Sequence, residues 1–371
     1  MSCLCDDMSW VLWRPKRSAR RASPGFPGPM IIETCTGSEN PDAVELVARG
    51  GVRGMRGKIR VGISACLLGQ NVRYDGGHKL DRYIRDTLGQ YLEFVPVCPE
   101  VECGMGVPRE AMRLVGDPGS PRLVTIRTGR DLTGQMLGWA ETRLKELEAE
   151  GLCGFIFKSG SPSSGMERVK VYTEGGMPSQ RGTGIFAKAF MERFPLLPVE
   201  DEGRLHDPKI RENFVERLFV MERWREVRSD PRHELSRLVE FHTKHKMLIM
   251  SHSPKHLREL GKLVASPGEM RDRTLWELYQ SSLMEALGLR ATPSKHANVL
   301  QHMLGYFKKE LSSDEKQEML ELIDALRRGL IPLIVPVTLM GHYVRKYGQP
   351  YLKEQVYLAP HPLELQLRNH V

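Results

Sequence analysis

The chain has 371 residues, a formal net charge of +8 and 40% hydrophobic residues. This length is typical of two domains, and the composition is typical of a folded protein in water. No apolar run approaches the ~20 residues that a membrane helix needs, so we expect no membrane contact. Seven cysteines are too few for a disulfide scaffold, which predicts a reducing, cytoplasmic location. The positive charge favours an anionic partner.

The first 57 residues differ in composition from the rest of the chain. They carry a basic run, RPKRSARR at 14–21, and a turn-rich run, PGFPGP at 24–29. Neither a helical nor a strand period persists there. We therefore expect residues 1–57 to be a disordered extension, or to lie upstream of the true start.

Residues 58–225 alternate short apolar runs with amphipathic segments. The amphipathic segments predict helices over 79–88, 133–150, 184–194 and 208–225. The apolar runs predict strands at 59–65, 94–97, 154–157 and 196–199, and a strand or hairpin arm at 123–126. Alternation of this kind predicts an α/β domain with a Rossmann-like parallel sheet and covering helices.

Three predicted strands end in loops with reactive side chains. Cys66 follows the first strand, Cys98 and Glu100 follow the second, and SGSPSSG at 159–165 follows the third. Parallel strands bring such loops to one edge of a sheet, where ligands bind in open α/β folds. Cys103 lies five residues beyond Cys98 and can turn back toward it. We therefore expect a cluster of three thiols.

Three thiolates without a partner histidine suit two kinds of centre. Zinc in a structural site normally takes a fourth protein ligand. An iron–sulfur cluster held by three cysteines would leave one iron open to bind a substrate atom. From the residues alone, both centres stay open.

Three motifs at these loops resemble the thiouracil desulfidase family: ISACLLG-x-x-VRYDGGHK at 63–79, VCPEVE-x-G-x-GVPRE at 97–110 and KSGSPSSGMERVKVY at 158–172. The C-terminal part resembles the YbgA-like domain, and the combination is similar to bacterial tRNA 4-thiouridine desulfidases. The family binds a 4Fe–4S cluster through three cysteines, and its open iron takes the substrate sulfur. Water then replaces that sulfur with no net redox change.

The resemblance implies roles for single residues. Cys66 and Cys98 would be cluster ligands, Glu100 the acid/base and Ser161 a substrate-positioning residue. Family members commonly carry the third ligand in a P-S-C-G motif, whereas this chain has Ser164 at that place.

Because a serine hydroxyl is a poor iron ligand beside thiolates, we expect Cys103 to supply the third thiolate. The other possibility is a degenerate cluster site. Four further side chains are predicted to contact the substrate, with the arginines gripping a phosphate: Arg73, Asp75, Arg109 and Ser159.

Residues 230–371 show helical spacing throughout, which predicts an all-α bundle. Residues 231–371 hold 20 Lys and Arg against 15 Asp and Glu, and ten of the chain's twelve histidines. Basic groups beside aromatic ones are typical of RNA binding. The predicted RNA contacts are Lys244, Lys246, Lys255, Lys308 and Lys309, within a cluster that also holds His242, His245, His252 and His256.

The sequence therefore predicts a 4Fe–4S enzyme that converts 4-thiouridine in tRNA to uridine. One alternative is a desulfidase of free thiopyrimidines or thiouridine nucleotides, which would not need the basic second domain. Another is a non-catalytic RNA-binding protein with a degenerate cluster site, as Ser164 permits. Nothing in the sequence points to a protein partner.

Overall fold

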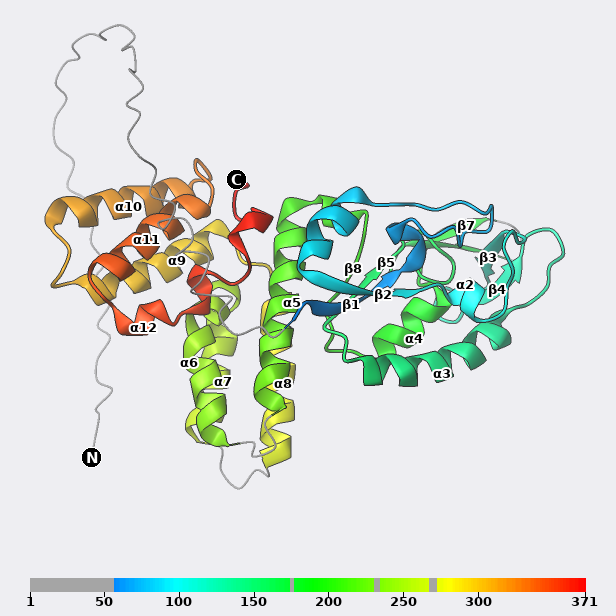
Figure 1. Ribbon diagram of the computed structural model, residues 1–371, viewed down its shortest axis with the longest axis horizontal. Helices are drawn as coiled ribbons and strands as arrows, with labels where there is room; N and C mark the ends of the chain where they lie inside the picture. The colour runs from blue at the N-terminus through cyan, green and yellow to red at the C-terminus, as the bar shows by residue number, and fades with distance from the viewer. Residues whose placement is uncertain (1–56, 174–176, 230–233, 267–271) are drawn as a thin grey trace, which may run out of the picture. The chain divides into compact units, whose positions relative to one another are not determined.

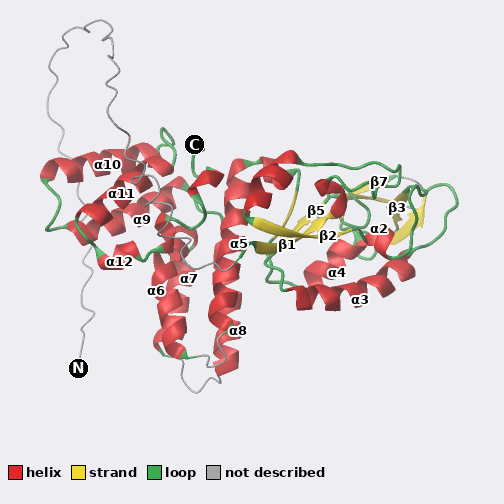
Figure 2. Ribbon diagram, viewed as in Figure 1, coloured by secondary structure: helices red, strands yellow, loops and turns green. Residues whose placement is uncertain are grey.

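The structure is a computed structural model that describes residues 57–173, 177–229, 234–266 and 272–371. All of these residues belong to one compact unit, Asp42–Val371. The predicted N-terminal extension lies outside the described residues, except for its last position. Figures 1 and 2 show strands with covering helices followed by a helical region, which confirms the predicted fold class.

Four strands form the predicted parallel sheet, in the order β2-β1-β5-β8. They are β1 (Ile59–Ser64), β2 (Leu92–Val97), β5 (Phe155–Phe157) and β8 (Val199–Asp201). Strand β1 pairs with β2 along its whole length, and every neighbouring pair is parallel. The loops after these strands therefore leave the sheet at the same edge. The fourth strand begins at the last residue of the predicted run 196–199.

Both faces of this sheet are buried, as expected for parallel strands. Strand β5 shows why, since Phe155 and Phe157 point into one core and Ile156 into the other. Helices α3 (Thr133–Glu150) and α4 (Ile185–Arg193) cover the first face, and α5 (Pro208–Arg228) covers the second. Helix α3 has the predicted bounds.

A second four-stranded sheet, in the order β4-β3-β6-β7, was not predicted as a sheet. It consists of β3 (Met112–Val115), β4 (Arg122–Thr125), β6 (Val169–Tyr172) and β7 (Pro178–Gly182). These strands are short, and β7 reads PSQRG with no apolar alternation. Only the run predicted at 123–126 gave a signal. The helix predicted over 79–88 is confirmed in part: its second half is helical, but as a π-helix, Tyr83–Thr87, followed by a 3-10 helix, Leu88–Gln90, rather than as an α-helix.

The C-terminal region is a helical bundle, and its apolar stripes belong to the same continuous core as the face of the parallel sheet that α5 covers. Trp224 of α5 lies in this core, where its ring packs edge-on against Phe241 and stacks on Tyr279 with a centroid distance of 5.3 Å. Among the described residues, no helix is both long and apolar enough to cross a membrane. The remaining helices are α6 (Leu235–His252), α7 (Pro254–Ala265), α8 (Asp272–Gly288), α9 (Pro293–Leu304), α10 (Ser313–Arg327), α11 (Ile334–Lys346) and α12 (Pro350–Lys353).

Candidate active site at the edge of the parallel sheet

A cavity of about 390 Å³ opens where the loops after β1, β2 and β5 meet. This size is within the range of small-molecule sites. The convergence follows from the parallel pairing, since each loop continues a strand at the same edge. Of the predicted site residues, seven line the cavity: Cys66, Arg73, Cys98, Glu100, Arg109, Ser159 and Ser161.

Cys66 reaches the cavity on a tight turn, Ala65–Leu68, that directly follows β1. The turn is fixed because the Cys66 carbonyl accepts a hydrogen bond from Lys79 N at 2.9 Å. The hydroxyl of Ser64 accepts another from Lys158 N at 2.9 Å, which ties the first loop to the third. Burial raises the pKa of the Cys66 thiol to about 11. The thiol is therefore neutral at pH 7 unless a metal displaces its proton.

Cys98 stands at the start of a short helix, α2 (Pro99–Glu102). Its backbone N–H donates to Glu102 Oε1 at 2.8 Å, which holds the first turn. Burial and the nearby carboxylate of Glu100 raise the pKa of the Cys98 thiol to about 12. Like Cys66, it is a buried, protonated thiol on the cavity wall.

Glu100 lies between the second and third loops. Its Oε1 accepts a hydrogen bond from Ser163 Oγ at 2.5 Å, and its Oε2 lies 3.5 Å from Cys98 Sγ. Arg109 Nη2 lies 3.8 Å from the same carboxylate, and both side chains are almost buried, at 12% and 10% exposure. The carboxylate is thus held in place beside a thiol and a hydroxyl, and it faces the cavity.

Cys103 is not brought to the cavity. Its Sγ lies 3.4 Å from the carbonyl oxygen of Glu100, and its side chain packs against the apolar core between α3 and the sheets. Gln135 Nε2 donates to the Cys103 carbonyl at 2.8 Å, which ties this loop to α3. Within the described residues, no three His, Cys, Asp or Glu side chains form a group that could hold a metal ion. This geometry does not support the ligand role predicted for Cys103.

Ser164 does line the cavity and is 3% exposed. The turn that carries it is built around Ser161, whose Oγ accepts hydrogen bonds from the N–H groups of Ser163 and Ser164 at 3.3 and 3.1 Å. Ser161 therefore shapes the loop as well as facing the cavity. The carbonyl of Ser163 accepts from Ala187 N at 3.1 Å, which anchors the turn on the start of α4.

The predicted substrate contacts separate into two groups. Arg73 and Arg109 line the cavity, although Arg109 Nη1 also donates to the Val72 carbonyl at 2.9 Å. Asp75 does not line the cavity. It lies 3.6 Å from Arg73 and accepts from Gly77 N at 3.0 Å, so it closes a turn. Ser159 lines the cavity, and its hydroxyl donates to Glu202 at 2.7 Å.

Two charged residues of this site were not predicted. Lys158 lines the cavity and forms an ion pair with Glu202, which also accepts from Ser159 N at 2.7 Å. Although burial opposes ionisation, hydrogen bonds from Lys158 and Ser159 hold the pKa of Glu202 below its usual value. Glu202 directly follows β8, so a correct position for that strand would have placed it at the same edge.

The predicted RNA contacts also divide. Lys244 is engaged by Glu240 at 2.8 Å and Glu354 at 3.5 Å, and Lys255 lies 3.8 Å from Glu259. Lys246, Lys308 and Lys309 are exposed and, in the part of the chain described, form no ion pair. Together with His302 and Tyr306 they form what we call the aromatic–basic patch; the Tyr306 ring is 38% exposed and stacks on Tyr351 at 5.2 Å.

The histidines predicted beside these lysines are not surface groups. His242 bonds to the Tyr279 hydroxyl at 3.0 Å, His245 to the Phe241 carbonyl at 2.8 Å and His252 to Glu216 at 2.6 Å. His256 bonds to Ser253 at 2.8 Å. All four are buried because α6 and the start of α7 lie inside the bundle. These histidines therefore do not share the exposed surface of the lysines.

Comparison with known proteins gives matches for both domains. The family described as 2-thiouracil desulfurase matches residues 61–202, and a family of unknown function, DUF1722, matches residues 246–362. The chain is 33% identical over 140 residues to the uncharacterized protein YbgA of Escherichia coli (strain K12), which covers 37% of this chain and 83% of that protein. It is 30% identical over 108 residues to the uncharacterized protein YbbK of Bacillus subtilis (strain 168), covering 28% of this chain and 71% of that protein.

One solved structure is also similar. It is described as the [4Fe-4S]-dependent thiouracil desulfidase TudS and is 33% identical in sequence. The match covers 40% of this chain and 95% of that chain, with a TM-score of 0.34.

Proposed function

Because the chain belongs to the 2-thiouracil desulfurase family through its first domain and to the DUF1722 family through its second, we propose that it is an iron–sulfur-dependent desulfidase. Its substrate is 4-thiouridine in tRNA, and its products are uridine and sulfide. The observation that supports this most directly is the cavity in which Cys66 and Cys98 lie with Glu100. Buried thiols beside a held carboxylate suit a metal-assisted hydrolysis.

The cofactor is a 4Fe–4S cluster, which when bound supplies a Lewis acid with affinity for the substrate sulfur. The donors on the cavity wall fit such a group in part. Cys66 and Cys98 offer two thiolates, and the hydroxyl-bearing Ser164 faces the same cavity from the third loop. Oxygen is a harder donor than sulfur, so the third ligand position would bind iron more weakly than the two thiolates do. We assign it to Ser164 because Cys103 packs elsewhere.

Glu100 handles the protons of the reaction. Its carboxylate accepts from Ser163 and lies within 3.8 Å of Arg109, so its position is held from two sides. From there it can take a proton from an incoming water and return one to the pyrimidine ring or to the departing sulfur. Ser161 and Ser159 line the same cavity from the third loop and orient the ring.

The second domain presents the RNA. The aromatic–basic patch offers an exposed tyrosine beside lysines, the combination that binds bases by stacking and phosphates by charge. Arg73, on the wall of the first cavity, would hold the phosphate of the nucleotide that enters. The two alternatives predict different substrates. Free thiouridine nucleotides would need only the first cavity, and a non-catalytic RNA-binding protein would need only the patch.

One experiment tests the proposal and separates the alternatives. The full chain is purified without oxygen, reconstituted with iron and sulfide, and its iron content and visible absorption are measured. We expect a cluster band and tRNA binding that weakens as salt rises. A chain that binds tRNA but takes up no cluster after reconstitution would refute the desulfidase and favour the degenerate site. A loaded chain with no affinity for tRNA would favour free thiopyrimidines.

A further inference from the structure

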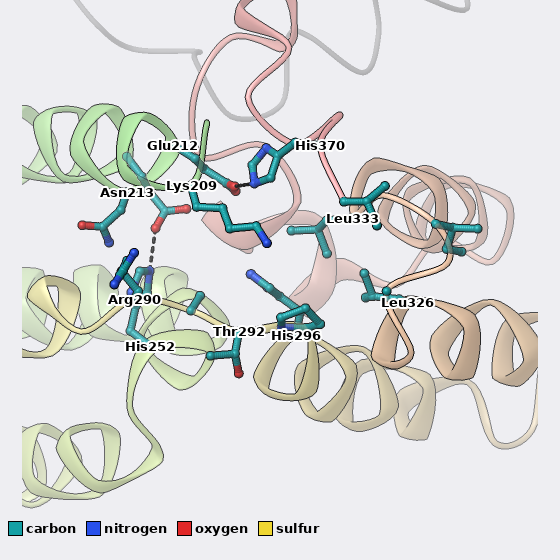
Figure 3. Close-up of a pocket in the computed structure, with 16 residues that line it drawn as sticks. Lys209, Glu212, Asn213, His252, Arg290, Thr292, His296, Leu326, Leu333 and His370 are labelled. Carbon is teal, nitrogen blue, oxygen red and sulfur yellow. Dashed lines mark hydrogen bonds and ion pairs between the residues drawn. The ribbon is translucent and has the colours of Figure 1, made fainter. Parts of the chain in front are cut away.

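A second cavity lies entirely within the helical region and the start of α5. It has a volume of about 350 Å³ and, among the described residues, shares none with the first cavity. Figure 3 shows side chains converging on it from α5, from the turn before α9 and from the segment between α10 and α11. None of the residues assigned to desulfidation or to the aromatic–basic patch lines it.

The acidic groups of this cavity are already paired. Glu216 is buried between His252, at 2.6 Å, and Arg368, at 3.3 Å. Glu212 lies 3.3 Å from Arg368 and 3.4 Å from His370. Each carboxylate therefore has a basic neighbour, and this wall is not built to take a free cation.

Two basic side chains on the cavity are unpaired. Lys209 and Arg290 both line it, and within the residues described neither side chain makes a hydrogen bond or an ion pair. Figure 3 shows the Lys209 amine directed into the space between the helices. One opposing charge is Asp207, which caps α5 through the N–H groups of Lys209 and Ile210. The charges of Arg290 and Lys209 help to lower the pKa of Asp207.

The same space is bounded by the first residues of two long helices. Helix α5 begins at Pro208 and α9 at Pro293, and residues from both first turns line the cavity. Helix N-termini carry partial positive charge and favour anions. Both ends are capped, by Asp207 and Thr292, so they add to the field of the two cations rather than forming a site themselves.

The rest of the wall suits an aromatic or sugar group. Leu326, Ile331 and Leu333 supply an apolar side. His296 is 8% exposed, and its Nδ1 bonds to the Tyr357 hydroxyl at 3.0 Å. The other ring nitrogen has no hydrogen-bond partner in the described part of the chain, although the residue faces the cavity. It is a polar group available to a ligand.

We propose that this cavity binds a nucleotide, with its phosphate between Lys209 and Arg290 and its base or sugar between His296 and the apolar side. An anion pairs with the unpaired cations, and the volume fits a ligand of nucleotide size. The nucleotide is either free or a unit of a bound RNA, since both offer the same phosphate and base. The site does not depend on the cluster or on Glu100.

The test compares a double variant, Lys209→Met with Arg290→Gln, with the wild-type full chain. Binding of uridine 5′-monophosphate, uridine, inorganic phosphate and tRNA is measured by calorimetry at fixed salt. Lys316→Met is the matched control, because it removes an exposed charge from the same domain away from the cavity. Arg73→Gln reports on nucleotide bound in the first cavity instead.

We expect the double variant, but not Lys316→Met, to weaken binding by at least about tenfold, both alone and when added to Arg73→Gln, since charge-assisted contacts to phosphate are lost. Weaker binding of the mononucleotide and of phosphate, with uridine binding little in either chain, identifies a free nucleotide. Weaker binding of tRNA alone identifies a unit of RNA. If neither loss occurs, or if Lys316→Met reproduces it, the proposal is wrong. Thermal unfolding checks that the variant is folded, and Lys209→Met alone serves if the double variant is not.

Discussion

Two residues, Cys103 and Ser164, decide how the first cavity could hold a cluster. The sequence alone favoured Cys103, because it lies near Cys98 in the chain and sulfur is the better donor for iron. The structure places Ser164 on the cavity and Cys103 against the core. Distance along a loop is a poor guide to side-chain direction, because a four-residue helix, α2, turns the chain between the two cysteines.

The first prediction follows from the different places of Cys103 and Ser164. Ser164→Cys should raise the iron content of the reconstituted chain and slow its loss in air, because a thiolate replaces an oxygen donor at the same corner. Cys103→Ser should leave iron content unchanged, and Cys98→Ser should abolish it. Iron and acid-labile sulfide per chain are the measurements. Loss of the cluster in Cys103→Ser, with no gain of iron in Ser164→Cys, would instead show that Cys103 is the third ligand.

The second prediction concerns Glu100. Glu100→Gln keeps the size and one acceptor oxygen toward Ser163, but removes the proton-accepting carboxylate. We expect sulfide release to fall by roughly 10²–10⁴ while iron content stays at the wild-type level. Glu102→Gln is the matched control, because Glu102 supports the start of α2 at Cys98 N and does not line the cavity. Equal losses in both variants would mean that Glu100 only supports the loop.

Among the helices and strands, those with strong periodicity were predictable and the short ones were not. Helix α3 shows a clear apolar stripe at Met136, Ala140, Leu144 and Leu147, and its bounds were predicted correctly. Strands of four or five residues, such as β3 and β7, carry too few positions to show alternation. The convergence of three loops was still predictable, since it depends only on parallel pairing of β1, β2 and β5.

The third prediction concerns the contact between α4 and the turn that carries Ser163 and Ser164. A Cβ atom on Gly184 would lie 2.5 Å from the Ser163 carbonyl oxygen and 2.9 Å from Gly165 N. Gly184→Ala should therefore destabilise the protein by about 1–3 kcal/mol and displace the turn that carries Ser164. Gly138→Ala is the control, because a Cβ there meets nothing within 4 Å on α3, and it should be neutral or stabilising. Denaturant unfolding measures both; equal stability of the two variants would contradict the close approach.

At the scale of the whole molecule, buried histidines make stability depend on pH. Burial lowers the pKa of His245 and His296 to about 3 and that of His242 and His361 to about 4, against about 6.5 when unfolded. Below pH 6.5 these histidines therefore bind protons in the unfolded chain but stay neutral in the folded chain. The contribution of these neutral histidines to the free energy of unfolding is complete above pH 6.5 and is lost as the pH falls. Glu212 acts in the opposite direction between about pH 4.5 and 7, because burial raises its pKa to about 7.

The fourth prediction combines these groups. Four histidines against one carboxyl leave an uptake of about three protons on unfolding, so the free energy of unfolding should fall by about 4 kcal/mol per pH unit between pH 6 and 5. The measurement is chemical unfolding at a series of pH values. His361→Gln should lower the proton uptake on unfolding by about one, and the slope should become shallower in proportion. Stability that is constant or rises on acidification would contradict the buried, neutral histidines.

The central claim is tested most directly by giving the anaerobically reconstituted full chain a tRNA that carries 4-thiouridine. Released sulfide and the remaining 4-thiouridine are measured together, with Cys98→Ser as the control. We predict one sulfide for each 4-thiouridine lost, no release by the control, and faster release from tRNA than from the free nucleotide. A wild-type chain that holds a full cluster but releases no sulfide from either substrate would contradict the account.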